Sequence, residues 1–290
     1  MHRAIGVIGG SGLYEMEGLE DVREVEVSTP FGAPSDALVV GRFAGRTLVF
    51  LPRHGRGHRY LPSEVPYRAN LWALKSLGVE WVLSVSAVGS LEEEVHPGEI
   101  VLPDQFIDRT WGRPSTFFGN GIVGHVGMAH PICGALQAAL WETREAAGVP
   151  FHRGGAYLCI QGPQFSTRAE SFLYRGWGAR VIGMTNATEA RLAREAELCY
   201  ATVALVTDYD CWHETEEEVS VDAILQVLHQ NVETAKRIIR EAAVRLPGER
   251  ECACGEAARY AILTAPEKIP PETRRAVELL YGKYLGGTGA

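Results

Sequence analysis

Apolar runs typical of β-strands alternate along this chain with segments of helical periodicity. The runs are rich in β-branched and aromatic residues, and they span residues 4–8, 47–51, 81–85, 156–160, 180–182 and 201–206. Between them, apolar residues recur at helical spacing over residues 65–77 and 221–235. This alternation predicts an α/β fold.

Two early runs constrain the sheet further. Residues 22–27 and 37–43 lie close together with no helical segment between them, so we expect part of the sheet to be antiparallel and the whole sheet to be mixed. In open α/β sheets, ligands bind beyond the carboxyl ends of the strands. Strand ends are therefore the places where functional residues are expected.

Length and composition indicate one domain with a C-terminal extension. The chain has 290 residues, of which 46% are hydrophobic and 22% charged, and this supports a sizeable core. Only "LPGERECACGEAAR", residues 246–259, has the composition of a connector. We predict a main domain over residues 1–246 and, over residues 247–290, a connector and a C-terminal helix packed on the same domain.

Charge and hydropathy exclude several kinds of partner. The formal net charge is -8 and no Lys/Arg block occurs, which argues against nucleic-acid binding. No window of about 18 residues is uninterruptedly apolar, and the first apolar run is short and closed by glycines, so neither a membrane span nor a signal peptide is expected. We expect a cytoplasmic protein that binds small molecules.

The six cysteines are scattered along the chain and form no C-x-x-C pair. No histidine lies at a spacing suited to zinc, so no metal site is expected. The thiols are either buried in a reducing cytosol or, as in thermophiles, partly joined in disulfides. The pair Cys252 and Cys254, one residue apart, keeps the second alternative open.

The first strand end, "IGGSG", combines glycines with the hydroxyl of Ser11 and could form an anion-binding nest or a plain glycine turn. It is no dinucleotide fingerprint, because Glu15 stands where the third glycine belongs. The second, "FLPRHGRGH", places Arg53 and His54 in a Gly-rich loop. The guanidinium of Arg53 could bind two phosphate oxygens through its fork, although a solvated surface loop is the simpler alternative.

Four further strand ends carry polar or aromatic side chains. Ser166 or Thr167 could cap a helix with Glu170, and Phe165 is either a core residue or a face for stacking a flat ring. The two aspartates of "TDYDCW" could be metal ligands, a general acid with its partner, or a solvated turn. The residues concerned are Ser86 and Ala87, Phe165 and Ser166, Met184 and Thr185, and Asp208 and Asp210.

Taken in order, these strand ends resemble the methylthioadenosine phosphorylase branch of the trimeric purine nucleoside phosphorylases. The resemblance covers residues 5–239 and rests on "GGSGLY", "RHGRGH", "SAVGSL" with "GEIVLPDQFIDRT", "GPQFSTRAES" and "TDYDCW" with "EEVSVD". It implies a nucleoside phosphorylase fold, which is a distorted mixed β-sheet flanked by α-helices, in one catalytic domain. It also implies a homotrimer or a dimer of trimers, with active sites near subunit boundaries and no metal or cofactor.

The resemblance also implies a role for individual residues. Inorganic phosphate, the co-substrate, is held by Ser11, Arg53, His54, Ser86, Ala87 and Thr185. Met184 lies under the ribose, Phe165 and Ser166 border the base, and Asp208 and Asp210 contact its polar edge. Val221, Ile224 and Leu225 line the place of the 5′ group, and His125 comes from a neighbouring subunit.

These residue types suit phosphorolysis of a purine nucleoside. The enzyme must hold an anion beside an oxocarbenium-like ribosyl group and accept the charge that develops on the purine. An enclosed aspartic acid has a raised pKa and can protonate N7, while the other carboxylate accepts from a 6-amino group. Adenine and an apolar 5′ group are therefore expected, with methylthioadenosine as substrate in purine and methionine salvage.

Some features keep other functions open. Asn186 and Ala187 stand where the resemblance leads us to expect a threonine–valine–proline-like run, and Gly183 replaces a larger polar residue. The nearest alternative is a 6-oxopurine nucleoside phosphorylase acting on inosine or guanosine. A non-catalytic nucleoside-binding module, a phosphate-free hydrolase and a dehydrogenase are more distant, because the phosphate-binding residues are all present and the glycine fingerprint is not.

Overall fold

A computed structural model describes residues 4–213 and 221–286 of the chain, without the side chains of Ser11 and of residues 221–229. At its centre the strand β5 (Val79–Ser90) runs parallel to β1 (Ala4–Gly9) and to β11 (Cys199–Tyr209), and antiparallel to β10 (Ala179–Gly183). Apolar residues fill all three long strands because both faces of this part of the sheet are covered.

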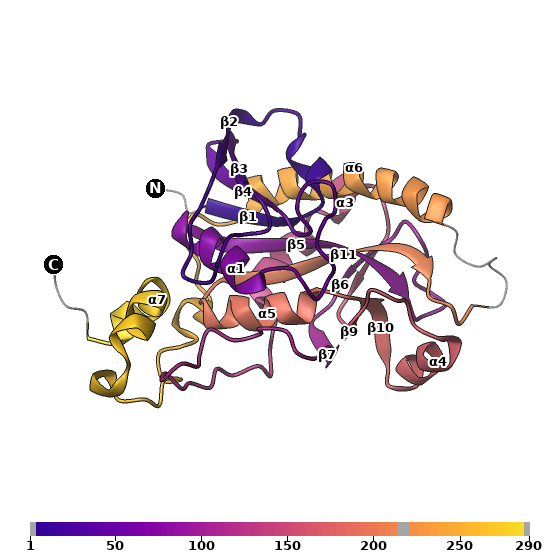
Figure 1. Cartoon of the computed structure of the whole chain (residues 1–290). Coiled ribbons are helices and arrows are strands. Elements are labelled where there is room, and N and C mark those ends of the chain that lie inside the picture. Colours follow the sequence, from indigo (N-terminus) through magenta and orange to yellow (C-terminus); the bar gives the residue numbers. More distant parts are fainter. Residues whose placement is uncertain (1–3, 214–220, 287–290) are drawn as a thin grey trace.

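The remaining strands extend the sheet on both sides of this centre (Figure 1). One edge is formed by β2 (Glu20–Val25), β3 (Leu38–Phe43) and β4 (Arg46–Pro52), with β2 and β3 antiparallel as expected. The other is formed by β9 (Ala156–Ile160) and β7 (Gln105–Arg109), while β6 (Ile100–Leu102) and β8 (Phe151–Arg153) branch from β11. The predicted α/β class with a mixed sheet is confirmed.

Helices cover both faces of the sheet. Figure 1 shows α6 (Val221–Arg245) above the strands and α5 (Asn186–Glu195) below them, next to α1 (Tyr67–Ser76). The other helices are α2 (Gly134–Trp141), α3 (Arg144–Ala147), α4 (Arg168–Gly176) and α7 (Pro271–Tyr281), with short 3-10 turns η1 (Ser11–Tyr14), η2 (Ala253–Glu256), η3 (Pro266–Lys268) and η4 (Gly282–Tyr284).

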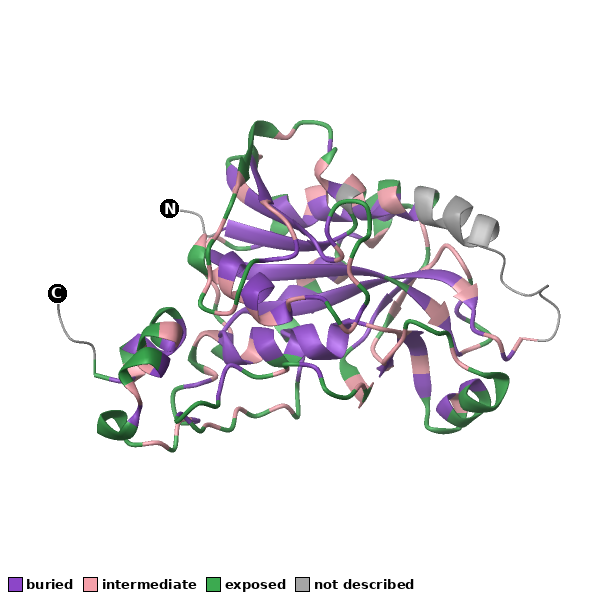
Figure 2. Cartoon of the chain, viewed as in Figure 1, coloured by how far each residue is buried: buried purple, intermediate pink, exposed green. Residues whose placement is uncertain are grey.

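The core lies between the central strands and these helices, and Figure 2 shows β1, β5 and β11 buried along most of their length. Large side chains such as Trp81, Tyr157 and Tyr200 are fully buried there. At the start of α4 a capping box joins Thr167 and Glu170, so the cap is Thr167 and not Ser166. None of the described helices is long and apolar enough to cross a membrane.

The C-terminal elements contact the part of the chain that precedes them. The ring of Tyr281 in α7 stacks on Phe118, with ring centroids 5.0 Å apart. The hydroxyl of Thr273 donates to the Asn120 carbonyl at 2.6 Å, and that of Tyr284 donates to Glu197 at 2.6 Å. The division of the chain at residue 246 stays a prediction.

Candidate active site

A cavity of about 380 Å³ opens where β1, β4, β5, β10 and β11 end or bend. The part of the chain that the structure describes contributes ten of the side chains or backbone positions expected from the sequence: Arg53, His54, Ser86, Ala87, Phe165, Ser166, Met184, Thr185, Asp208 and Asp210. Residues far apart in the sequence thus meet at strand ends, where α/β proteins bind ligands.

Five of the expected site residues are not seen to line the cavity. The side chains of Ser11, Val221, Ile224 and Leu225 lie outside the described part of the chain. His125 is exposed and does not line the cavity of its own chain; its backbone N–H donates to the Ala261 carbonyl at 2.9 Å. Its predicted place beside a neighbouring subunit's cavity stays a prediction.

Sequence reasoning missed several further lining residues. His58 stacks on His54, with ring centroids 4.3 Å apart, and Leu13 and Val232 add apolar surface. His58 and Leu13 belong to the quoted segments "RHGRGH" and "GGSGLY". Val232 lies on α6, two helical turns after Leu225, so the helical spacing of that segment could have indicated it.

The position of Asp208 depends on an irregularity in β11. Val206 pairs with Val88 of β5, but Asp208 pairs with the very next residue, Gly89, so Thr207 is an extra residue in the ladder. Such a bulge re-aims the side chains that follow it. The Thr207 hydroxyl donates to Asp208 Oδ2 at 2.6 Å, which holds the carboxylate at the cavity.

Gly89 makes room for the carboxylate of Asp208. A Cβ atom at this position would lie 3.0 Å from Asp208 Oδ1, 3.1 Å from Ile182 Cγ2 and 3.4 Å from Asp210 Cβ. Any side chain would therefore press on Asp208 and Ile182, while its contact with Asp210 would be an ordinary one. Since Gly89 also lines the cavity, glycine is needed here for close approach of side chains.

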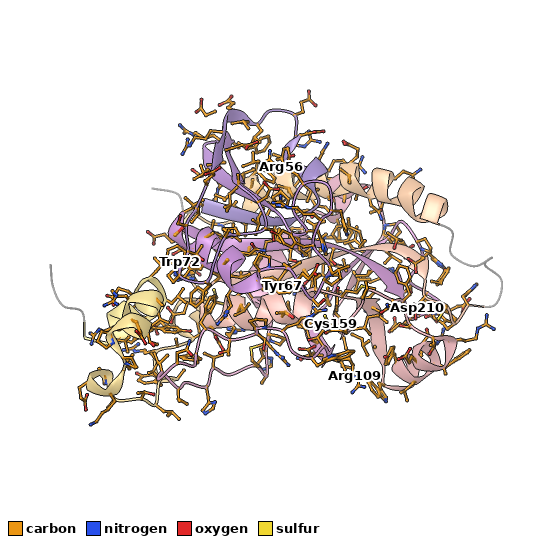
Figure 3. All side chains as sticks on the ribbon, in the orientation of Figure 1. Arg56, Tyr67, Trp72, Arg109, Cys159 and Asp210 are labelled. Carbon is orange, nitrogen blue, oxygen red and sulfur yellow. The ribbon has the colours of Figure 1, made fainter. Side chains whose placement is uncertain are left out.

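Asp210 has the surroundings of a protonatable carboxyl group. It is only 7% exposed, and its Oδ2 atom has no hydrogen-bond partner among the described residues. Burial raises the pKa of Asp210. Figure 3 shows Asp210 on the side of the molecule where Figure 1 labels β10 and α4.

Burial bears on the three interpretations of the aspartate pair. A solvated turn is wrong for Asp210, because the side chain is buried. Among the side chains that the structure describes, the group of three or more possible metal ligands consists of cysteines and does not include either aspartate. The role of the pair as an acid and its partner stays a prediction.

Arg53 also lines the cavity, and its guanidinium is bound by other protein groups. Its Nε donates to Glu189 Oε1 at 2.5 Å and its Nη2 to Glu189 Oε2 at 3.2 Å, while Nη2 also contacts Ser84 and Nη1 donates to the Val85 carbonyl at 2.9 Å. The expected fork on two phosphate oxygens is therefore wrong in this structure, because the carboxylate of Glu189 already occupies it. One N–H of Nη1 is not used by these bonds.

His54 is a neutral imidazole that can accept a hydrogen bond. Its Nδ1 lies 2.8 Å from the Tyr60 carbonyl and must carry the proton, because a carbonyl oxygen only accepts. Burial, and then the charge of Arg53, lower the pKa of His54 to about 4. Near neutral pH its Nε2 is thus an acceptor.

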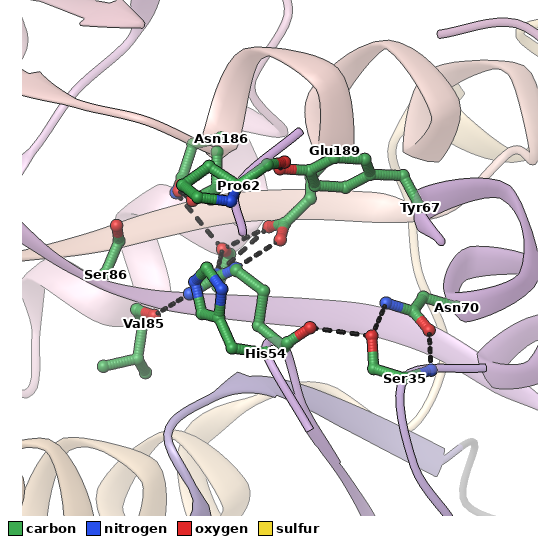
Figure 4. Close-up of polar contacts among 12 residues, drawn as sticks. Ser35, His54, Pro62, Tyr67, Asn70, Val85, Ser86, Asn186 and Glu189 are labelled. Carbon is green, nitrogen blue, oxygen red and sulfur yellow. Dashed lines mark hydrogen bonds and ion pairs between the residues drawn. The ribbon is translucent and has the colours of Figure 1, made fainter. Parts of the chain in front are cut away.

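A buried chain of hydrogen bonds fixes the loop that carries Arg53 and His54. Asn70 of α1 donates to Ser35 Oγ at 2.8 Å, and Ser35 Oγ donates to the Arg53 carbonyl at 2.7 Å. The Ser35 backbone N–H donates to Asn70 Oδ1 at 2.8 Å. Figure 4 shows Asn70 and Ser35 joined by two of these hydrogen bonds, so α1 holds the loop in place through Asn70.

The start of α5 forms another part of the cavity wall. Thr185 precedes the first helical residue and lines the cavity, so the partial positive charge of the helix N-terminus lies there. The Thr185 hydroxyl donates to Asn186 Oδ1 at 2.9 Å, and no side chain caps this helix end. The partial positive charge of the helix start and its uncapped backbone N–H groups both favour an anion at this end of the cavity.

The three departures noted in the sequence have little effect on the cavity. Asn186 is fully buried and donates to Ser84 and Thr202, and Ala187 packs in an apolar cluster, so neither lines the cavity. Gly183 does line it, but a Cβ there would overlap the hydroxyl of Tyr157. A larger residue is excluded at that position because Tyr157 fills the space.

Four cysteines that are scattered along the sequence lie together in the structure. Four of them, Cys133, Cys199, Cys252 and Cys254, have their sulfur atoms within 4.8 Å of one another, and we call them the cysteine cluster. Spacing along the sequence could not show this, because the cluster joins the start of α2, the start of β11 and the segment at η2. No member lines the cavity.

The fold is that of a nucleoside phosphorylase, and the comparisons agree. The chain belongs to the phosphorylase superfamily, whose family model matches residues 4–243. It is 59% identical to S-methyl-5'-thioadenosine phosphorylase of Geobacter sulfurreducens over 98% of this chain and 100% of that protein.

Solved structures are similar as well. A methylthioadenosine phosphorylase from an antarctic soil metagenomic library has a TM-score of 0.92 and 48% identity, covering 97% of this chain and 99% of that one. A variant of the adenosine/methylthioadenosine phosphorylase of Schistosoma mansoni, in complex with methylthioadenosine, has a TM-score of 0.81 and 39% identity over 88% of this chain and 95% of its own.

Proposed function

We propose that this protein catalyses the phosphorolysis of S-methyl-5'-thioadenosine to adenine and 5-methylthioribose 1-phosphate, in purine and methionine salvage. One observation carries the proposal: a buried carboxyl group with a raised pKa and an unpartnered oxygen, Asp210, lies in the same cavity as Arg53, His54 and the start of α5. A proton donor for a leaving base and an anion site for a nucleophile are the two requirements of phosphorolysis.

Phosphate binds at the end of the cavity formed by His54, Ser86 and Thr185. His54 Nε2 accepts from an O–H of hydrogen phosphate, because the imidazole is neutral and its Nδ1–H is used by Tyr60. The Ser86 hydroxyl and the unused N–H of Arg53 Nη1 donate to the other oxygens. Because Glu189 neutralises Arg53, the helix N-terminus at Thr185 supplies part of the charge that attracts the anion.

The base binds at the end formed by the two aspartates. As the C1′–N9 bond breaks, electron density moves into the purine, and a carboxylic acid that donates to N7 takes up this charge. The burial of Asp210, its unpartnered Oδ2 atom and the raised direction of its pKa support this residue as the donor to N7, and Asp208 then accepts from the 6-amino group. The buried Ser166 hydroxyl, unpartnered among the described groups, offers a further contact, and Phe165 offers its ring for stacking.

The 5′ methylthio group needs an apolar wall and no hydrogen bond. Leu13 and Val232 supply such surface in the described part of the cavity, beside the positions expected for Val221, Ile224 and Leu225. A group without polar atoms gains most from this surface, because a 5′ hydroxyl would lose hydration there. Methylthioadenosine is preferred to adenosine for this reason.

A homotrimer, or a dimer of trimers, would complete the site. Phe165 lines the cavity but is 74% exposed in the single chain, and the large apolar side chains Phe172, Leu173 and Trp177 of the adjacent α4 region are also exposed. A second copy covering this surface would enclose the base and bring His125 to the 5′ end. No cofactor is proposed, and the cytoplasmic location stays a prediction.

The test measures base release from methylthioadenosine, adenosine and inosine, each with and without inorganic phosphate. We expect release that depends on phosphate and is fastest with methylthioadenosine. A rate of base release that does not depend on phosphate would contradict the phosphorylase proposal. A preference for inosine would instead favour the 6-oxopurine alternative, and binding without turnover would favour the nucleoside-binding module.

A further inference from the structure

The cysteine cluster gathers four thiols from three separate segments in one buried place. Cys133 is the residue before α2, Cys199 begins β11, and Cys252 and Cys254 stand on either side of the first residue of η2. Cys133, Cys199 and Cys254 are buried and Cys252 is half-buried. Four thiols in one buried place are far more than the packing of single core cysteines requires.

The distances fit a tetrahedral metal site. Zinc bound by four thiolates at about 2.3 Å holds the sulfurs about 3.8 Å apart. In the cluster, Cys252 Sγ lies 3.7 Å from Cys133 Sγ and 3.3 Å from Cys199 Sγ, and every pair is within 4.8 Å. We propose that the cysteine cluster binds one zinc ion through all four sulfurs.

The shared position of Cys252 favours a metal over disulfides. A disulfide joins two sulfurs about 2.05 Å apart and excludes a third. Here Cys252 is close to two other thiols at once, and all six cysteines of the chain are present as thiols. One central ion can bind all four sulfurs at these positions. Two disulfides would instead require the four sulfurs to separate into two bonded pairs.

The surroundings can compensate the charge of the bound site. Zinc displaces four thiol protons to solvent, and the ion with four thiolates then carries two negative charges. The Nη1 atom of Arg194 lies 3.8 Å from Cys254 Sγ. The Leu136 backbone N–H also donates to Cys133 Sγ at 3.5 Å. Such donors around thiolates stabilise a metal site from its second layer.

The site has the character of a structural one. All four coordination positions come from protein sulfurs, so none is left for a water or a substrate. No member of the cluster lines the cavity. Zinc would fasten the segment at η2, which follows the end of α6, to the starts of α2 and β11. It therefore stabilises the attachment of the C-terminal elements without taking part in the reaction.

The first experiment measures metal bound to the full-length protein, purified with a phosphine reductant and without chelators. Elemental analysis is expected to find about one zinc per chain, and Cys199→Ser and Cys254→Ser to lose most of it. Cys211→Ser is the matched control, because Cys211 lies outside the cluster, and it should keep the metal. Zinc content is read independently of activity, so failure of this proposal leaves the proposed reaction untouched.

A second measurement covers the case in which the serine variants do not fold. A mercurial reagent added to the wild-type protein should release zinc to a colorimetric indicator as the thiols react. Protein freed of zinc and given Co²⁺ alone should show the thiolate-to-cobalt charge-transfer absorption of a tetrahedral sulfur site. Wild-type protein that retains no zinc after incubation with the ion, or disulfides within the cluster found by mass spectrometry of the reductant-treated protein, would overturn the proposal.

Discussion

Glu189 binds the guanidinium of Arg53 with both carboxylate oxygens, at 2.5 Å to Nε and 3.2 Å to Nη2, and both side chains are buried. The carboxylate also accepts from Ser84 at 2.6 Å and Tyr200 at 3.0 Å. The pair thus brings no net charge to the wall of the cavity, and the arginine is positioned by the protein before any anion arrives.

Glu189→Gln is expected to leave this arginine buried without a counter-charge. Loss of one partner of a buried pair costs about 3 kcal/mol or more of unfolding free energy. Inorganic phosphate can replace the lost charge, so it should raise the thermal midpoint of the variant more than that of the wild type. Glu233→Gln, which breaks only the surface contact with Lys236, is the control. An equal response to phosphate in both proteins would contradict the proximity of Arg53 to the anion.

His54→Asn is expected to weaken phosphate binding selectively. The amide nitrogen of asparagine can take the place of Nδ1 and keep the bond to Tyr60, but nothing replaces the acceptor Nε2. The KM for phosphate should rise about 10-fold, the worth of one hydrogen bond to a charged group. His54→Gln places an amide near the Nε2 position and should recover part of the loss. Steady-state kinetics at varied phosphate, with saturating nucleoside, separates this effect from a change in the KM for methylthioadenosine.

The aspartates should differ in their substrate dependence. Asp210→Asn removes the acid for every purine and is expected to lower kcat/KM about 100-fold or more on both methylthioadenosine and inosine. Asp208→Asn removes the acceptor for a 6-amino group and should lower activity on adenine nucleosides far more than on inosine. Equal losses on both substrates for Asp208→Asn would remove Asp208 from base recognition.

Gly89→Ala should disturb the aspartate pair without unfolding the protein. The added methyl group would lie 3.0 Å from Asp208 Oδ1 and 3.1 Å from Ile182, so the carboxylate must move by a few tenths of an ångström. Misplacing a reacting group in this way is expected to lower kcat/KM about 10-fold or more. Gly127→Ala, where an added Cβ meets nothing within 4 Å, is the matched control. Full activity of Gly89→Ala would show that the strand leaves more room than the structure indicates.

Glu195 should make stability fall as the pH rises. Burial raises the pKa of Glu195 from 4.5 to about 7, although the Phe117 N–H and the Thr116 hydroxyl bind the carboxylate. Between these two values the folded chain binds more protons than the unfolded one, so the free energy of unfolding decreases with rising pH.

Glu195→Gln is neutral throughout and should be more stable than the wild type at about pH 8, by up to about 3 kcal/mol, with no gain at about pH 4. Thermal midpoints across this range, with the exposed Glu145→Gln as control, measure the effect. A gain that persists at the acidic end would mean that packing, and not the charge, is responsible.

The strands and the helix cap were predicted well because they depend on patterns among neighbouring residues. Alternation of apolar runs with helical periodicity placed the main strands, and β9 was predicted at its full length, residues 156–160. A helix cap close to Glu170 was predicted too, with Ser166 and Thr167 as alternatives, and the structure has Thr167. Arg53 and His54 directly follow β4, and Met184 and Thr185 directly follow β10, so these residues could be named from strand ends. Ser86, Ala87 and Asp208 lie within β5 and β11, which continue further than the apolar runs of the sequence indicated.

Features made by distant segments could not be predicted in this way. Arg53 was expected to bind two phosphate oxygens through its guanidinium. The packing of α5 against the sheet instead places the Glu189 carboxylate against that group. The cysteine cluster arises because the segment at η2 folds back onto the starts of α2 and β11. Neither contact has a spacing rule, since the partners are more than a hundred residues apart for Arg53 and more than fifty for Cys199 and Cys252.

The sequence by itself determined the α/β class, the mixed sheet and the strand ends at which the functional residues lie, because hydrophobic period and turn residues act over a few neighbours. Tertiary structure alone decided the protonation and partners of those residues. Burial raises the pKa of Asp210, a carbonyl fixes the proton of His54, and Gly89 leaves the space that the carboxylate of Asp208 occupies. Each of these properties depends on neighbouring groups from distant parts of the chain, which come together only when the chain folds.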